Sequence, residues 1–66
     1  MAIYEYTAKK DKGLVRFQLK DPSDRIVAEG TGSTVSEAQQ KALEAAKHDG
    51  ARLYLQQVKF PESLAD

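Results

Sequence analysis

The segment LVRFQLK, residues 14–20, alternates strictly between two kinds of side chain. Val15, Phe17 and Leu19 fall on one side of an extended chain, and polar or charged residues dominate the other side. This period of two predicts a β-strand that buries one face and exposes the other to solvent. The rest of the chain must therefore supply neighbouring strands and an element that covers the apolar face.

A second alternating segment precedes this strand. In residues 2–8, AIYEYTA, the side chains of Tyr4, Tyr6 and Ala8 share one face, and the aromatic and β-branched content favours a strand. Residues 9–13, KKDKG, form a polar stretch that ends in glycine, which is typical of a turn between two strands.

A third strand is predicted for residues 25–31, RIVAEGT, with Ile26 and Ala28 on its inner face. Pro22 and two aspartates in residues 21–24 predict a turn before it, because proline presets φ and aspartate side chains bond nearby amides. Short connections between consecutive strands favour antiparallel neighbours. We therefore expect the three strands to form an antiparallel meander.

An alanine-rich helix is predicted to follow the third strand. Thr34 and Glu37 have the T-x-x-E spacing of a capping box, in which the threonine side chain accepts from a first-turn amide and the glutamate reaches back. Small side chains at helical spacing would let this helix lie close to the sheet. The residues concerned are Ala38, Ala42, Ala45 and Ala46. The helix is expected to cover the apolar face of residues 14–20.

The end of this helix has two interpretations. Asp49 and Gly50 could stop it, with Gly50 in a left-handed cap, and residues 51–60 would then form a short fourth strand. Alternatively the helix continues to about Gln57, because a glycine inside a helix costs only about 1 kcal/mol relative to alanine. We predict the long helix, which Pro61 would end.

These elements predict an α+β fold of order β-β-β-α, a three-stranded antiparallel meander followed by one long C-terminal helix packed on one face. Residues 1–60 are expected to form a single domain and residues 61–66 a flexible C-terminal tail. The chain has no cysteine, which suits a reducing cytoplasm. Its apolar runs are far shorter than the roughly 20 residues needed to span a membrane, so no membrane association is expected.

The glycine-rich joint before the helix invites comparison with phosphate-binding loops. Its sequence, GTGST, lacks the lysine of the pattern G-x-x-x-x-G-K-[ST] and the third glycine of G-x-G-x-x-G. Gly30 and Gly32 are therefore interpreted as residues of a bulge or turn. The functional alternative is an incidental anion contact at the helix start.

Side chains that catalysis or metal binding would require are scarce. His48 is the only histidine and is interpreted as a solvated surface residue, and no cysteine is present to help bind a metal. Ser33 and Ser36 lie several helical turns from His48, too far for the histidine to activate either serine. The sequence therefore predicts a protein that is not an enzyme, uses no cofactor and binds no metal.

One candidate binding surface is basic. Three lysines lie in the first predicted turn, where they could contact phosphates. The chain as a whole has ten basic and ten acidic residues, so it lacks the positive charge typical of a nucleic-acid binder. The candidate nucleic-acid contacts are Lys9, Lys10, Lys12, Gly32, Ser33 and Ser36.

The other candidate surface is the sheet face that a single helix leaves open. This face is mixed in character, and the outer strand has an unpaired edge of the kind that proteins block or use for pairing. We expect an unidentified protein, or a second copy of the chain in a homodimer, to bind here. The candidate interface residues are Ile3, Leu14, Arg16, Gln18 and Val27.

Residues 27–46 resemble the last strand and helix of the double-stranded RNA-binding domain. The family's helix pattern is matched at Glu37-Ala38, Ala42 and Ala45-Ala46. The resemblance implies a strand-strand-strand-helix fold and RNA contact through the first hairpin loop. The family's phosphate-gripping lysines would fall on Val35, Ser36 and Gln39, none of which is basic, and its N-terminal helix has no counterpart here.

The chain also resembles the N-terminal domain of HicB-type antitoxins, a trimmed version of the same fold. The corresponding positions, in order, are Asp21-Pro22, Gly32, Thr34, Glu37-Ala38, Ala42, Ala45 and Leu53-Tyr54-Leu55. The spacing before Leu53 is longer than that family's usual helix, and only a handful of residues follow Phe60, where the family has a DNA-binding domain. The resemblance implies an antitoxin-like interaction module.

We therefore predict a small non-catalytic interaction module that binds protein, either antitoxin-like or self-associating. The alternative is weak binding of RNA or DNA through the Lys9–Lys12 loop and the helix N-terminus. The two functions differ in their response to salt, because a phosphate binder loses affinity steeply as salt rises.

Overall fold

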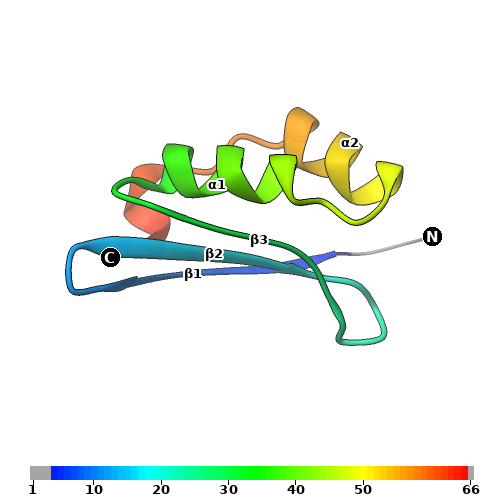
Figure 1. The fold of residues 1–66 in the computed structure, drawn as a ribbon, viewed down its shortest axis with the longest axis horizontal. Helices are drawn as coiled ribbons and strands as arrows, with labels where there is room; N and C mark the ends of the chain where they lie inside the picture. Colours follow the sequence, from blue (N-terminus) through cyan, green and yellow to red (C-terminus); the bar gives the residue numbers. More distant parts are fainter. Residues whose placement is uncertain (1–3, 66) are drawn as a thin grey trace.

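The computed structural model describes residues 4–65 and contains one sheet with helices on one of its faces (Figure 1). Its elements, in chain order, are β1 (Glu5–Asp11), β2 (Leu14–Lys20), β3 (Ile26–Gly32), α1 (Val35–Glu44), α2 (Asp49–Gln57) and a final 3₁₀ turn, η1 (Glu62–Ala65). The strands pair in the order β1-β2-β3, and both pairs are antiparallel. The predicted α+β class and three-stranded meander are confirmed.

The turn between β1 and β2 is shorter than predicted. β1 continues to Asp11, which pairs with Leu14, so only Lys12 and Gly13 form the turn. Their φ angles are 53° and 81°, the left-handed values that a two-residue type I′ hairpin requires. Lys9 and Lys10 were both expected in this turn, and both are instead residues of the strand.

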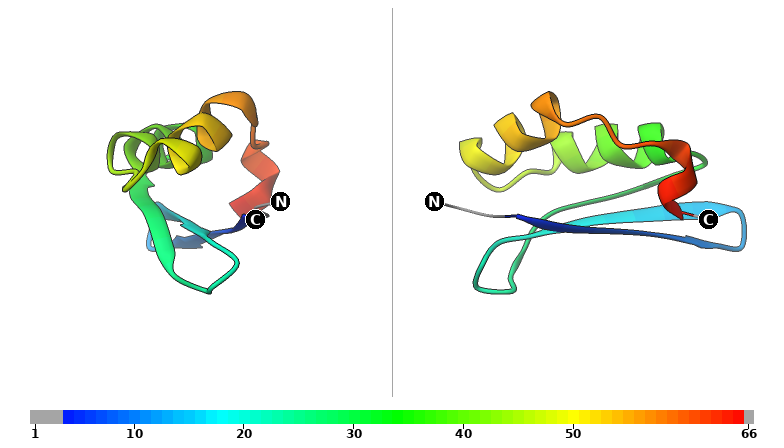
Figure 2. Two further views of the ribbon diagram at one scale, coloured as in Figure 1. Left: turned by 90° about the vertical axis from the view of Figure 1, so that its right-hand side faces the viewer. Right: turned by 180° about the vertical axis from the view of Figure 1, so that it is seen from behind.

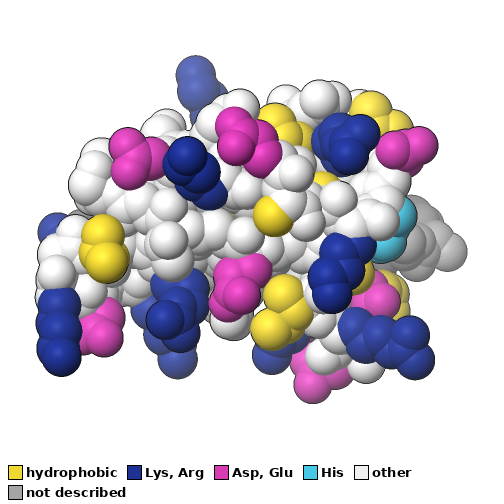
Figure 3. All heavy atoms as spheres, in the orientation of Figure 1, with side chains coloured by type: hydrophobic (Ala, Val, Ile, Leu, Met, Phe, Trp, Pro, Cys, Tyr) yellow, Lys and Arg dark blue, Asp and Glu magenta, His cyan; other side chains and the backbone are white. Residues whose placement is uncertain are grey.

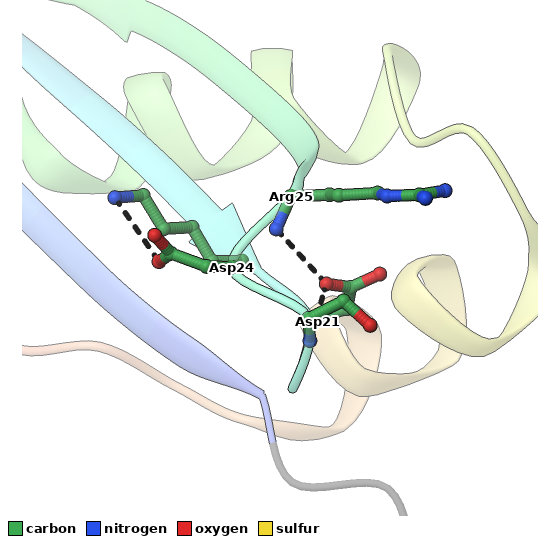
Figure 4. Close-up of polar contacts among 5 residues, drawn as sticks. Asp21, Asp24 and Arg25 are labelled. Atoms are coloured by element: carbon green, nitrogen blue, oxygen red, sulfur yellow. Dashed lines mark hydrogen bonds and ion pairs between the residues drawn. The ribbon is translucent and has the colours of Figure 1, made fainter.

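Asp21 organises the turn between β2 and β3 (Figure 4). Its carboxylate accepts hydrogen bonds from the amides of Ser23 at 2.9 Å and Arg25 at 3.0 Å. Asp24 has a φ of 67°, and its carboxylate lies 3.6 Å from the ammonium of Lys20. The aspartate-rich turn predicted here is therefore confirmed. It is stabilised, as predicted, by hydrogen bonds from nearby backbone amides to an aspartate side chain.

β3 contains a bulge at Val27. Leu19 pairs with Ala28, but the next residue, Lys20, pairs with Ile26, so Val27 is an extra residue on β3. Val27 and Ala28 are both buried, at 5% and 2% exposure, whereas Ile26 is 39% exposed. The prediction that Ile26 faces the core is wrong, because the extra residue shifts the alternation of the strand.

The helices cover a single face of the sheet (Figures 1 and 2), as predicted. The core beneath α1 is formed by side chains of β2, which are Val15, Phe17 and Leu19. A Cβ at Gly30 would collide with backbone atoms of Ala38 and Ala42 in α1. The backbone of α1 therefore lies directly on β3, and Gly30 permits this close approach, whereas a bulge or turn was predicted.

Two helices occupy the place of the one long helix that was predicted, and that prediction is wrong. After α1, the amide of Lys47 donates to the carbonyl oxygen of Val27 in β3 at 2.9 Å. His48 is the N-cap of α2, because its Nδ1 accepts a hydrogen bond from the amide of Ala51 at 3.3 Å. These two contacts require the chain to leave the helical path between residues 45 and 48.

The alternative prediction for this region, a fourth strand in residues 51–60, is also wrong, since α2 continues to Gln57. Gly50 lies in the first turn of α2 and is not a C-terminal cap. No helix within residues 4–65 has both the length and the apolar character needed to cross a bilayer.

The chain after α2 returns across the sheet to the start of α1 (Figure 2, right). Phe60 is 5% exposed, and its ring packs against the ring of Tyr6 with 4.6 Å between centroids. The side-chain amide of Gln39 in α1 donates to the carbonyl oxygens of Leu55 and Val58, both at 2.8 Å. These contacts place η1, which lies in the segment predicted to be a tail, over β1.

Candidate functional site

The helices leave the opposite face of the sheet uncovered (Figures 1 and 2). We call it the open face. Alternation along the strands assigns to it Glu5, Thr7, Lys9, Asp11, Leu14, Arg16, Gln18, Lys20, Glu29 and Thr31. In Figure 3 basic side chains project from the lower, sheet-bearing part of the molecule, with acidic side chains between them.

Two positive charges face each other on the open face. Lys9 of β1 pairs directly with Arg16 of β2, and both residues are exposed. Like charges in directly opposite positions destabilise a sheet. Within residues 4–65 neither side chain forms an ion pair, whereas the neighbouring Lys20 is held by Asp24. The Lys9–Arg16 pair is therefore an unneutralised basic site on an otherwise mixed surface.

An exposed leucine lies beside this basic pair. Leu14 is 56% exposed although it starts the central strand of the sheet. Together with the pair it lines a hollow of about 280 Å³ near the β1–β2 turn, which we call the hairpin hollow. The hollow is lined by Lys9, Asp11, Lys12, Leu14, Arg16 and Thr31. It offers a ligand three cations, one carboxylate and one apolar side chain within a small area.

The predicted protein-interface residues do not all lie on the open face. Leu14 and Arg16 lie there and are exposed. Gln18 also lies there, half-buried, and its amide donates to the carboxylate of Glu29 at 2.6 Å. Val27 lies in the core, since the bulge turns it inward. Ile3 lies outside the described residues.

The predicted nucleic-acid contacts are also divided between surfaces. Lys9 lies on the open face and Lys12 in the turn. Lys10 pairs with Val15, which faces the core, so it projects from the helix side of the β1 edge. The start of α1 lies at the same end of the molecule as the β1–β2 turn (Figure 1). The three lysines therefore do not form one basic loop.

The amides at the start of α1 are already bonded to side chains of the chain itself. Glu62 bridges two of them, because its two carboxylate oxygens accept from Val35 at 2.8 Å and from Ser36 at 3.0 Å. The capping box supplies two more bonds: the amide of Glu37 donates to the hydroxyl oxygen of Thr34 at 3.1 Å, and the amide of Ser33 donates to the carboxylate of Glu37 at 3.0 Å. An anion could reach these donors only by displacing Glu62.

Gly32 contributes packing at this joint, since a Cβ there would lie 2.7 Å from the side chain of Glu37. Sequence reasoning identified the capping box but missed Glu62, which is more than 25 residues away in the chain. The one available signal was an acidic residue after Pro61, and a helix N-terminus stabilises any carboxylate that the fold brings to it.

An aromatic cluster lies at the other end of the molecule. The ring of Tyr4 is 5.2 Å from the ring of Tyr54 and 6.2 Å from the ring of His48. Burial raises the pKa of the Tyr54 phenol, and the neighbouring phenol of Tyr6 adds to the rise. The cluster joins the start of β1 to α2. Within residues 4–65 no group of three or more histidine or acidic side chains lies close enough together to hold a metal ion.

The chain matches no protein-family model, no curated protein and no solved structure.

Proposed function

We propose that this protein is a small non-catalytic interaction module that binds a protein partner through its open face. The observation that carries the proposal is the Lys9–Arg16 pair, two opposed cations that form no ion pair within residues 4–65 and lie beside the exposed Leu14. This combination supports a partner segment that presents an acidic side chain next to an apolar one. The resemblance to an antitoxin N-terminal domain is consistent with such a role.

The chemistry of the hairpin hollow defines what the partner must supply. A carboxylate between Lys9 and Arg16 would replace a repulsive contact with two attractive ones, and arginine binds carboxylates in a planar, two-pronged geometry. An apolar side chain over Leu14 would remove that residue from water. Gln18 is already bonded to Glu29 and so contributes less to binding.

Nucleic-acid binding is the second candidate function, and the same basic residues favour it. Lys9, Lys12 and Arg16 line one hollow and could contact phosphates. The helix start supports this function less, because Glu62 occupies the donors that a phosphate would use. The net charge of zero also provides little long-range attraction for a polyanion.

Binding of short labelled probes, followed by fluorescence anisotropy, tests the proposal. The probes are a peptide of alternating glutamate and leucine, its lysine-leucine counterpart, and an RNA duplex. We expect the acidic peptide to bind and Arg16→Glu to weaken it about tenfold or more, since a charge-assisted hydrogen bond contributes roughly 1.5–3 kcal/mol.

Lys59→Glu is the matched control, because it changes the net charge equally at an exposed position outside the sheet. It should leave the affinity within about twofold. An equal loss of affinity in Arg16→Glu and Lys59→Glu would contradict a specific site on the open face. Equal binding of the acidic and basic peptides would contradict it as well. Preference for the duplex, with affinity that falls steeply as salt rises, would favour nucleic-acid binding instead.

A further inference from the structure

Among the described residues no strand pairs with the outer edge of β1. A two-residue type I′ hairpin closes on a hydrogen-bonded pair, here Asp11 and Leu14, so every second residue back along β1 directs its backbone groups toward β2. The residues between them, Tyr6, Ala8 and Lys10, therefore direct their N–H and C=O groups outward. Within residues 4–65 no hydrogen bond other than those of the sheet involves β1.

The other edge of the sheet is less suitable for strand addition. β3 is interrupted by the bulge at Val27, and the carbonyl of that residue already accepts a hydrogen bond from Lys47. Bulges are a common means of terminating pairing at a sheet edge. β1, by contrast, is regular over its whole length from Glu5 to Asp11. It forms the outer margin of the sheet, with η1 above it on the helix side (Figure 2, left).

The charges of β1 restrict which strand it can accept. Lysines on an edge strand discourage random pairing, because an added strand must place an acidic residue opposite them. A second β1 meets this requirement when the two strands run antiparallel with Thr7 opposite Thr7. Glu5 of each copy then lies opposite Lys9 of the other, and Tyr6 lies opposite Ala8.

We propose that two copies of this chain associate edge to edge through β1, with a two-fold axis at Thr7, to form one continuous six-stranded sheet. Lys9, which lies opposite Arg16 within one copy, gains a carboxylate from Glu5 of the second copy. Tyr6, 42% exposed in the single chain, gains Ala8 of the second copy as a neighbour. Tyr6, Ala8 and Lys10 gain backbone partners along the joined edge.

Charge exchange across the proposed axis gives a specific test by sedimentation equilibrium. The native chain should be a dimer whose dissociation is measurable in the micromolar-to-millimolar range. Lys9→Glu and Glu5→Lys should each weaken the dimer by about tenfold or more, because each places like charges opposite one another at two symmetric positions. Circular dichroism verifies that each variant keeps the native fold.

Two further samples restore opposite charges at the facing positions 5 and 9 of the two copies. The double variant E5K/K9E should dimerise like the native chain, since the charges are only exchanged. An equimolar mixture of the two single variants should form a heterodimer, because one copy then carries two lysines and the other two glutamates at the facing positions. Lys59→Glu, away from the edge, should leave dimerisation unchanged.

A cysteine substitution tests the register independently. Thr7 lies opposite itself in a non-hydrogen-bonded pair, where Cα atoms are about 4.5 Å apart, a distance that a disulfide can bridge. The natural chain has no cysteine, so Thr7→Cys introduces a single thiol. We expect it to form a disulfide-linked dimer on mild oxidation much faster than Thr31→Cys, an exposed residue of β3 on the same face.

A native chain that stays monomeric to millimolar concentration would overturn the proposal. So would a dimer that both single variants leave intact, or equal crosslinking through residues 7 and 31. Lys9 belongs both to this interface and to the hairpin hollow, but Glu5 and Thr7 do not line the hollow, and neither Glu5→Lys nor Thr7→Cys alters Arg16 or Leu14. Failure of this inference therefore leaves the peptide-binding result interpretable, and the reverse also holds.

Discussion

At the scale of single residues, Gly30 determines how closely the two layers pack. A side chain there would meet the backbone of α1 at Ala38 and Ala42, which cannot move without displacing the helix. The sequence indicated that this glycine was structural but not which structure it served. Its role depends on contacts with Ala38 and Ala42, which lie eight or more residues further along the chain, and local patterns do not predict such contacts.

Replacing Gly30 with alanine tests this packing. We expect Gly30→Ala to lower the free energy of unfolding by about 1–3 kcal/mol or more, the usual cost of overpacking. Gly13→Ala is the comparison, because its Cβ would meet no atom within 4 Å and its cost comes only from a φ of +81°, roughly 1–2 kcal/mol. Urea unfolding measures both. A Gly30→Ala variant as stable as the native chain would contradict the close approach.

Tyr54 should make the free energy of unfolding decrease at high pH. Its pKa is raised in the folded chain by burial and by Tyr6, so the folded state holds the phenolic proton more tightly than the unfolded state. The stability from this group is fully present below the unfolded pKa of about 10 and is lost as pH rises through the higher folded value. Unfolding free energies measured from pH 8 to 11 should therefore fall less steeply in Tyr54→Phe than in the native chain. Identical slopes would show that Tyr54 makes no such contribution.

At the scale of elements, the sequence predicted what local rules determine. The strand of residues 14–20, the aspartate-rich turn at residues 21–24 and the capping box at Thr34 all follow from nearest neighbours, and all are present. The break between α1 and α2 was missed because it depends on a bond from Lys47 to β3 and on histidine as an N-cap. Serine, threonine, aspartate and asparagine are the usual caps, so His48 gave little signal.

Glu62 connects the last element to the first helix, and its removal should have a local effect. Glu62→Ala leaves the amides of Val35 and Ser36 without their acceptors, at a cost of about 1 kcal/mol. Hydrogen exchange should accelerate at those two amides and in η1, with little change in α2. Glu44→Ala, which removes an exposed carboxylate from the opposite end of α1, is the matched control. Equal exchange in both variants would show that the Glu62 bridge is not formed.

At the scale of the whole molecule, the two proposed surfaces lie side by side and share Lys9. Joining two sheets at β1 would place two hairpin hollows on one continuous surface, and a partner with two acidic segments would then bind with higher apparent affinity than one segment alone. The open face itself was predictable, since one helical layer covers only one side of a sheet. The pairing of Lys9 with Arg16 across the strands was not predictable, because it depends on the strand register and on a turn of two residues.

The most direct test of the central claim is a titration of the isotope-labelled chain with the alternating glutamate-leucine peptide, followed by amide chemical shifts at two salt concentrations. If the open face is the binding site, shifts will concentrate on residues 9–16 and Thr31, while α1 and α2 stay unchanged. Shifts confined to the helical layer, or none at millimolar peptide, would contradict the claim.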